Sequence, residues 1–203
     1  MNRRGAVAKG NDFYGIPSRQ MVSSFSKART LSAAQLARIT DRQVYLSLEL
    51  QRAFGLRREE ALKFRPAYAD RGDRLVLKAS WTKGGKAREI PIRTDEQRKI
   101  LGRVWQLAGR GSLIPTERSY IQHLRVYVRQ IMNAGLSKMH GLRHAYAQER
   151  YFDLTGWSCP IAGGPNTQSL NRQDRQIDKA ARLTISAELG HVREQIMSVY
   201  IGR

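Results

Sequence analysis

The chain has 203 residues, 41% of them hydrophobic, a size that suits one globular domain and leaves little room for two. Lys and Arg total 36 against 17 Asp and Glu, and the resulting formal charge of +19 predicts an anionic partner, with nucleic acid as the first candidate. The basic residues are dispersed, and no apolar run approaches the roughly 20 residues of a spanning helix, which argues against a membrane partner. The single cysteine, Cys159, excludes an intrachain disulfide and a Cys-based zinc site.

Residues 1–29 mix Gly, Ser, Lys and Arg with few periodic apolar positions, and we expect a basic arm or linker there. The basic start is not followed by the apolar stretch that a secretory signal needs. We therefore expect a cytoplasmic, nucleoid-associated protein whose folded domain covers residues 30–203.

Two helices are predicted at the start of this domain. Ser32 with Gln35, and Thr40 with Gln43, form capping-box patterns, each of which opens a helical stretch. The second stretch is apolar over more than one face, which predicts a buried helix, and it ends at Gly55.

A β-hairpin is predicted after a short helical stretch, RREEALKF. Leu75 and Leu77 alternate with polar neighbours, and Ile90 and Ile92 do the same. The sequence TKGGK lies between the two alternating segments, so its two lysines are expected at the tip of the hairpin.

The second half of the chain is predicted to be helical around one long loop. Thr94 with Gln97, and Ser119 with Gln122, are further capping-box patterns, and another helix is expected over residues 140–151. Residues 155–171 are rich in Gly, Pro, Ser and Asn, and we expect this loop to lie outside the core. One more helix and a last short turn complete a mostly helical α+β domain with a small hairpin.

Four segments resemble the tyrosine recombinase (phage integrase) family, in the family's order, across roughly residues 30–203. The segments are AFGLRREEAL, WTKGGKAREIPI, HGLRHAYA and ELGHVREQIMSVY. Each alone would be weak, but their combination identifies the chain as resembling the catalytic domain of that family. The residues that match the motifs are Arg57, Glu60, Lys83, His140, Arg143, His191 and Tyr200.

The chemistry of a phosphodiester explains two of these residue types. Transesterification without a metal must neutralise two non-bridging oxygens, and guanidinium groups offer planar forks of donors that stay protonated. The resemblance assigns this task to Arg57 and Arg143.

The resemblance also implies the remaining roles. Tyr200 is the expected nucleophile, which forms a 3′-phosphotyrosine and conserves bond energy, so no cofactor is expected. Lys83 is expected to protonate the departing 5′-oxygen, His140 to help accept the tyrosine proton and His191 to bind the phosphate.

Several neighbouring residues admit plainer interpretations. Lys86 is three residues from Lys83, and either could be a solvated hairpin charge or a phosphate contact. We expect DNA contacts at Lys86, Arg88 and His144. His140 and His144 could pair on a metal, but no HExxH glutamate or third ligand is evident, and no metal site is expected.

The resemblance implies site-specific DNA recombination, for integration or excision of a mobile element, with double-stranded DNA as partner and a homo-oligomer, a tetramer, on DNA when the protein is full-length. Relatives carry a core-binding domain that residues 1–29 are too short to form, so we expect a catalytic domain without it. Two rivals stay open: a type IB topoisomerase-like enzyme, and a catalytically inert basic DNA-binding fragment.

Overall fold

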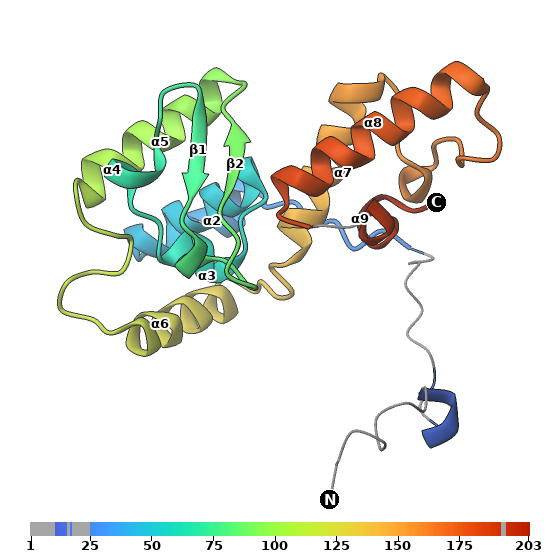
Figure 1. Cartoon of the computed structure of the whole chain (residues 1–203). Helices are drawn as coiled ribbons and strands as arrows, with labels where there is room; N and C mark the ends of the chain where they lie inside the picture. The colour runs from blue at the N-terminus through green and yellow to red at the C-terminus, as the bar shows by residue number, and fades with distance from the viewer. Residues whose placement is uncertain (1–10, 16, 18–24, 192–193) are drawn as a thin grey trace, which may run out of the picture.

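The computed structural model describes residues 11–15, 17, 25–191 and 194–203 (Figure 1). Within these residues the chain is mostly helical and holds one two-stranded antiparallel sheet, which confirms the predicted α+β fold. Most of the predicted arm over residues 1–29 lies outside the described residues. No helix in the described part of the chain combines the length and apolar character needed to cross a membrane.

The elements follow the predicted order. The strands are β1 (Arg74–Leu77) and β2 (Arg88–Pro91), and short 3-10 turns are η2 (Asn11–Tyr14), η3 (Ala79–Trp81), η4 (Pro160–Ala162) and η5 (Glu194–Ile196). The α-helices are α1 (Ala33–Ala37), α2 (Arg42–Phe54), α3 (Arg58–Leu62), α4 (Pro66–Ala69), α5 (Asp95–Ala108), α6 (Tyr120–Asn133), α7 (Gly141–Thr155), α8 (Arg172–Glu188) and α9 (Met197–Ile201).

Capping residues set three of the four helix starts at which the sequence predicts a capping box. The capping boxes at Ser32, Thr94 and Ser119 are all formed, so those predictions are confirmed. The box predicted at Thr40 is wrong, because the next residue, Asp41, is the N-cap of α2 and accepts the Val44 backbone N–H at 3.0 Å. A carboxylate at the cap also favours the positive end of the helix dipole.

The hairpin is confirmed, with Leu75 paired to Ile90 and Leu77 paired to Arg88. Leu75, Leu77 and Ile90 are completely buried, whereas the tip around Lys83 is exposed. The root of the hairpin is therefore fixed by apolar packing, and its tip projects into solvent.

Helix α2 is the centre of the packing. Leu50 and Phe54 belong to a core cluster shared with the hairpin, α5 and α7 to α9, whereas Val44 and Leu48 belong to a second cluster shared with α6. This agrees with the prediction that the helix is apolar over more than one face. In Figure 1 the hairpin with α2 to α5 forms one side of the molecule and α7 to α9 form the other.

The loop over residues 155–171 is not outside the core, and that prediction is wrong. Cys159 is 1% exposed and belongs to the main core cluster, with Trp157 and Ile161 packed against the same cluster. The turn η4, inside the loop, contacts α9. A few apolar side chains spaced through a polar segment are enough to anchor it, because they pack against the core and η4 packs against α9.

Gly164 offers a direct test of this anchoring. A Cβ atom there would lie 1.6 Å from the Ser158 carbonyl oxygen, so backbone must shift to accept it. We expect Gly164→Ala to lower the free energy of unfolding by about 1–3 kcal/mol, measured by urea denaturation. Gly102→Ala is the control, because open space surrounds Gly102 in α5 and the change should leave stability equal or higher. Equal stability of the two variants would show that the loop is not held in place.

Candidate active site

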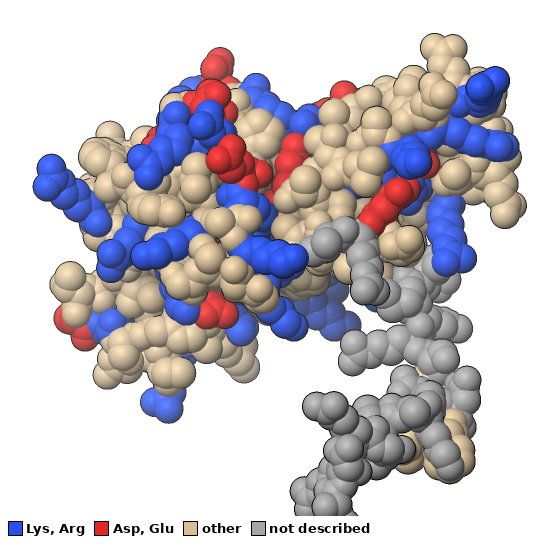
Figure 2. All heavy atoms as spheres, viewed as in Figure 1, with Lys and Arg blue, Asp and Glu red and all other residues tan. Residues whose placement is uncertain are grey.

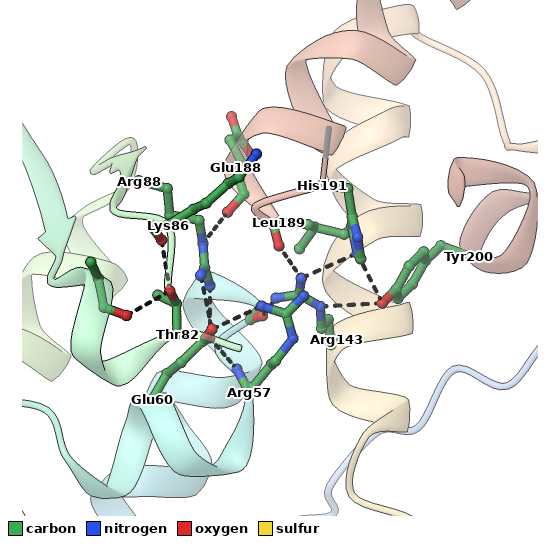
Figure 3. A network of polar contacts seen from close by, with 12 residues as sticks. Arg57, Glu60, Thr82, Lys86, Arg88, Arg143, Glu188, Leu189, His191 and Tyr200 are labelled. Carbon is green, nitrogen blue, oxygen red and sulfur yellow. Dashed lines mark hydrogen bonds and ion pairs between the residues drawn. The ribbon is translucent and has the colours of Figure 1, made fainter. Parts of the chain in front are cut away.

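Tyr200 lies on α9 with its side chain turned into the protein. Met197 and Ile201 are completely buried, and their packing fixes the face of this short helix. The Tyr200 side chain is itself 5% exposed, and its hydroxyl accepts a hydrogen bond from Arg143 Nε at 3.4 Å (Figure 3). Its backbone carbonyl accepts a hydrogen bond from Gln148 of α7 at 3.0 Å. Two motifs that are far apart in the sequence thus meet at one oxygen atom.

Arg143 is held by the C-terminal ends of two helices. Its Nη1 donates to the Gly55 carbonyl at 2.6 Å, and its Nη2 donates to the Leu189 carbonyl. These carbonyls cap α2 and α8, whose C-terminal ends carry partial negative charge. Gly55 has a left-handed conformation, φ 60°, and a Cβ there would lie 2.6 Å from Tyr146, so the position requires glycine.

Arg143 is 1% exposed, and its burial has an electrostatic cost. Burial lowers the pKa of Arg143 to about 10, and the charges of Arg57 and Arg88 act in the same direction. The guanidinium nevertheless stays protonated at pH 7, because that pKa is well above 7.

Glu60 joins the other predicted arginine to this centre. Its carboxylate accepts hydrogen bonds from the Arg57 backbone N–H at 2.7 Å and from Arg57 Nη1 at 2.9 Å. The Glu60 side chain is completely buried. Burial raises its pKa, but hydrogen bonds and charge from Arg88 outweigh this and lower the pKa to about 2.

Arg88, at which a DNA contact is predicted, turns its guanidinium into the protein and not to the surface. Its Nη1 and Nη2 donate to the two Glu60 oxygens at 2.8 and 2.7 Å, and its Nε donates to the Glu188 carbonyl at 2.8 Å. The residue is 8% exposed. A signal was present in the sequence, since Arg88 lies two residues before Ile90 and so shares the buried face of β2.

His191 is the histidine that contacts the tyrosine hydroxyl. Its Nε2 lies 3.3 Å from the Tyr200 oxygen and 3.5 Å from Arg143 Nη2. Burial, followed by the charges of Arg143 and Arg57, lowers the pKa of His191 to about 4. A guanidinium can only donate, so Nε2 is placed as an acceptor on a neutral imidazole.

His144 and His140 flank the tyrosine from α7. The His144 ring centroid lies 4.6 Å from that of Tyr200, and the residue is 3% exposed, so it faces the tyrosine and not the surface on which a DNA contact was predicted. His140 is the exposed N-cap residue of α7, with its ring centroid 6.1 Å from that of Tyr200. The predicted proton acceptor is therefore less closely placed than His191, whose centroid lies at 5.6 Å.

A cleft of about 730 Å³ opens beside these residues. Arg57, Lys83, Lys138 and His140 contribute to its walls, so the hairpin tip and the start of α7 face the same space. Lys86 is exposed on the tip but is not part of this lining. Figure 2 shows Lys and Arg side chains spread over the visible face of the molecule, with fewer Asp and Glu among them. This distribution favours an anionic ligand.

Three residues of the site lie outside the four motif segments: Gln148, Lys138 and Lys27. Gln148 lies four residues after His144, and that helical spacing was a usable signal. Lys27 reaches the site from outside the motifs, and together with Lys138 it lines a second pocket of about 550 Å³ against His144. Among the described residues, no group of three or more His, Cys, Asp and Glu side chains is placed to hold a metal ion.

Comparisons with known proteins indicate the family and the fold of this chain. The model of a family described as "Integrase" matches residues 18–149. Among solved structures, the chain is similar to the crystal structure of XerA recombinase, with a TM-score of 0.50 and 15% sequence identity, over 94% of this chain and 65% of that one. The chain therefore spans less than two thirds of the length of that recombinase. No curated protein matches the chain.

The histidine environments predict a pH dependence of stability. The pKa values of His191 and His144 are lowered to about 4, and those of His140 and His123 are lowered as well. The unfolded chain, with histidine near 6.5, then binds more protons than the folded chain between these values. We expect the free energy of unfolding to fall as the pH is lowered from about 6.5 to about 4, measured by urea denaturation at each pH. Imidazole NMR signals of His191 and His144 that titrate near pH 6.5 would contradict this.

Proposed function

Because this chain belongs to the integrase family, of the tyrosine recombinase type, we propose that it cuts and rejoins double-stranded DNA with Tyr200 as the nucleophile. Family membership supports site-specific recombination in general. The observation that carries the finer proposal is the meeting of Arg143 Nε and His191 Nε2 at the Tyr200 hydroxyl. Two of those three residues lie beyond the matched range of 18–149, so the geometry adds support that is independent of the family match.

The proposed cleavage step is a transesterification. The Tyr200 oxygen forms a bond to phosphorus, the bond from phosphorus to the 5′-oxygen breaks, and the product is a 3′-phosphotyrosine with a free 5′-hydroxyl. The reverse attack by a 5′-hydroxyl rejoins the strand, so the bond energy is conserved without a cofactor.

Three side chains, those of Arg143, Tyr200 and His191, are arranged so that hydrogen bonds can run from the first to the second and from the second to the third. Arg143 donates to the Tyr200 oxygen, which leaves the tyrosine proton free to be donated to His191 Nε2. We therefore assign the tyrosine proton to His191, in place of His140. The negative charge of a phosphate bound nearby would raise the pKa of His191 and strengthen it as an acceptor.

The two predicted phosphate ligands keep their roles in the proposal. Arg57 lines the cleft and would neutralise a non-bridging oxygen of a phosphodiester bound there. Arg143 is 1% exposed and lies behind the attacking oxygen, so it would reach the phosphodiester when Tyr200 moves forward to attack. Lys83 lines the same cleft and would give a proton to the departing 5′-oxygen. Use in integration or excision of a mobile element, assembly as a tetramer on DNA, and association with the nucleoid belong to this proposal.

Tyr200→Phe tests the nucleophile. The change removes one oxygen and keeps the ring, so DNA binding should persist while the covalent adduct disappears. The substrate is a pool of nicked duplexes of randomised sequence, whose short cleaved fragment diffuses away and leaves the adduct for a denaturing gel. Tyr68→Phe, at a partly exposed tyrosine, is the matched control and should form the adduct normally.

Other outcomes of that assay separate the rivals. An adduct formed by Tyr200→Phe would identify a different nucleophile, and the absence of any adduct with the unaltered chain would favour the inert DNA-binding fragment. Adduct formation with plasmid relaxation but no strand exchange between two sites would favour the topoisomerase-like enzyme. Arg143→Ala should slow adduct formation about 100-fold, because one lost donor to a developing charge costs on the order of 3 kcal/mol.

Lys83→Ala tests the general acid. We expect the variant to cut ordinary DNA about 100-fold more slowly, because its 5′-oxygen leaves without a proton. DNA with sulfur in place of the bridging 5′-oxygen should restore the rate, since a thiolate is a good leaving group without protonation. Lys86→Ala is the matched control on the same hairpin tip and should be close to normal on both substrates. If Lys86→Ala is the variant that sulfur rescues, the two lysines exchange roles.

A further inference from the structure

Arg88 lies where three elements of the described structure meet. It begins β2, it binds Glu60 of α3 through both guanidinium Nη atoms, and its Nε binds the carbonyl of Glu188 at the end of α8 (Figure 3). Space is kept for it at Gly190, where a Cβ atom would lie 2.9 Å from Arg88 Cδ. Its side chain is 5% exposed, so DNA does not have access to it in this arrangement.

The two arginines that bind the Glu60 carboxylate make different numbers of side-chain hydrogen bonds to it. Arg88 binds both carboxylate oxygens, whereas the side chain of Arg57 reaches only one of them, through Nη1 at 2.9 Å. The Arg57 side chain is 19% exposed and lines the cleft. A buried carboxylate needs a full set of donors. Because Arg88 supplies most of that set, Arg57 can keep part of its guanidinium available to the cleft.

The Arg88 guanidinium also supports Arg143, the second proposed phosphate ligand. Arg88 Nε fixes the Glu188 carbonyl, and the next carbonyl along the chain, that of Leu189, accepts from Arg143. The Glu188 carboxylate is fixed separately, by the Tyr146 hydroxyl at 2.7 Å and by Arg150. The end of α8 is thus held from both sides next to Arg143.

We propose that Arg88 is a positioning residue, which satisfies Glu60 so that Arg57 faces the phosphodiester and which fixes the end of α8 that holds Arg143. This proposal rests on the proposed function for the identity of the phosphodiester. Without Arg88, Glu60 would be a buried carboxylate with Arg57 as its nearest cation, and Arg57 would turn inward to bind both of its oxygens.

The first experiment compares crystal structures of the full chain with Arg88 and with Arg88→Gln. We expect Arg57 to bind both Glu60 oxygens in the variant, and an unchanged Arg57 would overturn the proposal. Affinity for dimethyl phosphate, a minimal phosphodiester, is followed through the Arg57 Nε NMR signal and should fall about tenfold. Cleavage of the nicked duplex pool should slow about 100-fold, as expected for a misplaced ligand.

Two further variants control for stability. Arg74→Gln removes an arginine from the same hairpin whose side chain is 46% exposed and pairs with Asp73 and Glu89, and it should leave Arg57, phosphate affinity and cleavage unchanged. Arg88→Lys keeps a positive charge beside Glu60 but lacks the planar fork of donors that binds two carboxylate oxygens side by side. If Arg88→Gln fails to fold, Arg88→Lys takes its place, because we expect its retained charge to let it fold. Unchanged affinity of folded Arg88→Lys for dimethyl phosphate would overturn the proposal.

A pH titration separates positioning from general destabilisation. Glu60 faces Arg57, Arg88 and Arg143, with His140 nearby. When Arg88 is removed, burial should raise the pKa of the Glu60 carboxyl group, and carboxyl NMR can measure this change. In Arg88→Gln, protonation of Glu60 should release Arg57, so affinity for dimethyl phosphate should recover as the pH falls, relative to Arg74→Gln at each pH. A constant deficit at all pH values would indicate a merely structural role.

These readouts keep the two proposals distinguishable. If the unaltered chain forms no adduct with DNA, the proposed strand cleavage fails. The orientation of Arg57 in the two crystal structures still decides the role of Arg88.

Discussion

A site for a phosphodiester must hold positive charges together before the anion arrives, and the architecture around Glu60 meets this constraint. Burial lowers the pKa of Arg143, and the positive charges of Arg57 and Arg88 lower it further, because like charges repel. The buried carboxylate of Glu60 binds both Arg57 and Arg88 and supplies a negative charge between them. Two helix C-terminal carbonyls stabilise the charge of Arg143 without adding a carboxylate beside Tyr200, the proposed nucleophile.

The fold can be understood from the elements that these contacts need. Helix α2 must end beside Arg143 to supply the Gly55 carbonyl, and its two apolar faces anchor it in both core clusters. Helix α8 must end beside both Arg88 and Arg143, which requires β2 and α7 to pack against the same helix. Glycine follows or ends each of these helices, because Tyr146 and the Arg88 side chain leave no room for a Cβ at Gly55 or Gly190.

Local signals predicted much of this arrangement and missed what depends on tertiary contacts. Three capping boxes, the hairpin and the fold class follow from patterns within a few residues of one another. The inward turn of Arg88, for which a DNA contact was predicted, depends on Glu60, 28 residues away. The contact of His191 with the Tyr200 hydroxyl depends on how α9 packs, and the anchoring of residues 155–171 depends on the same helix. No local pattern encodes these contacts. The sequence therefore predicted which residues belong to the site better than it predicted which residues each of them contacts.

The hairpin shows how one short element can serve two different requirements of the proposed reaction. At its root, Leu77 and Ile90 are completely buried and Arg88 is bound to α3 and α8, so the phosphate ligands rest on a rigid support. At its tip, Lys83 is exposed and lines the cleft, with the turn closed by Thr82 bonds to the Ala79 and Lys86 carbonyls. A general acid has to reach an oxygen whose position is set by the DNA, whereas the arginines have to be in place before the charge develops. Separating a fixed root from an exposed tip lets the same two strands meet both needs.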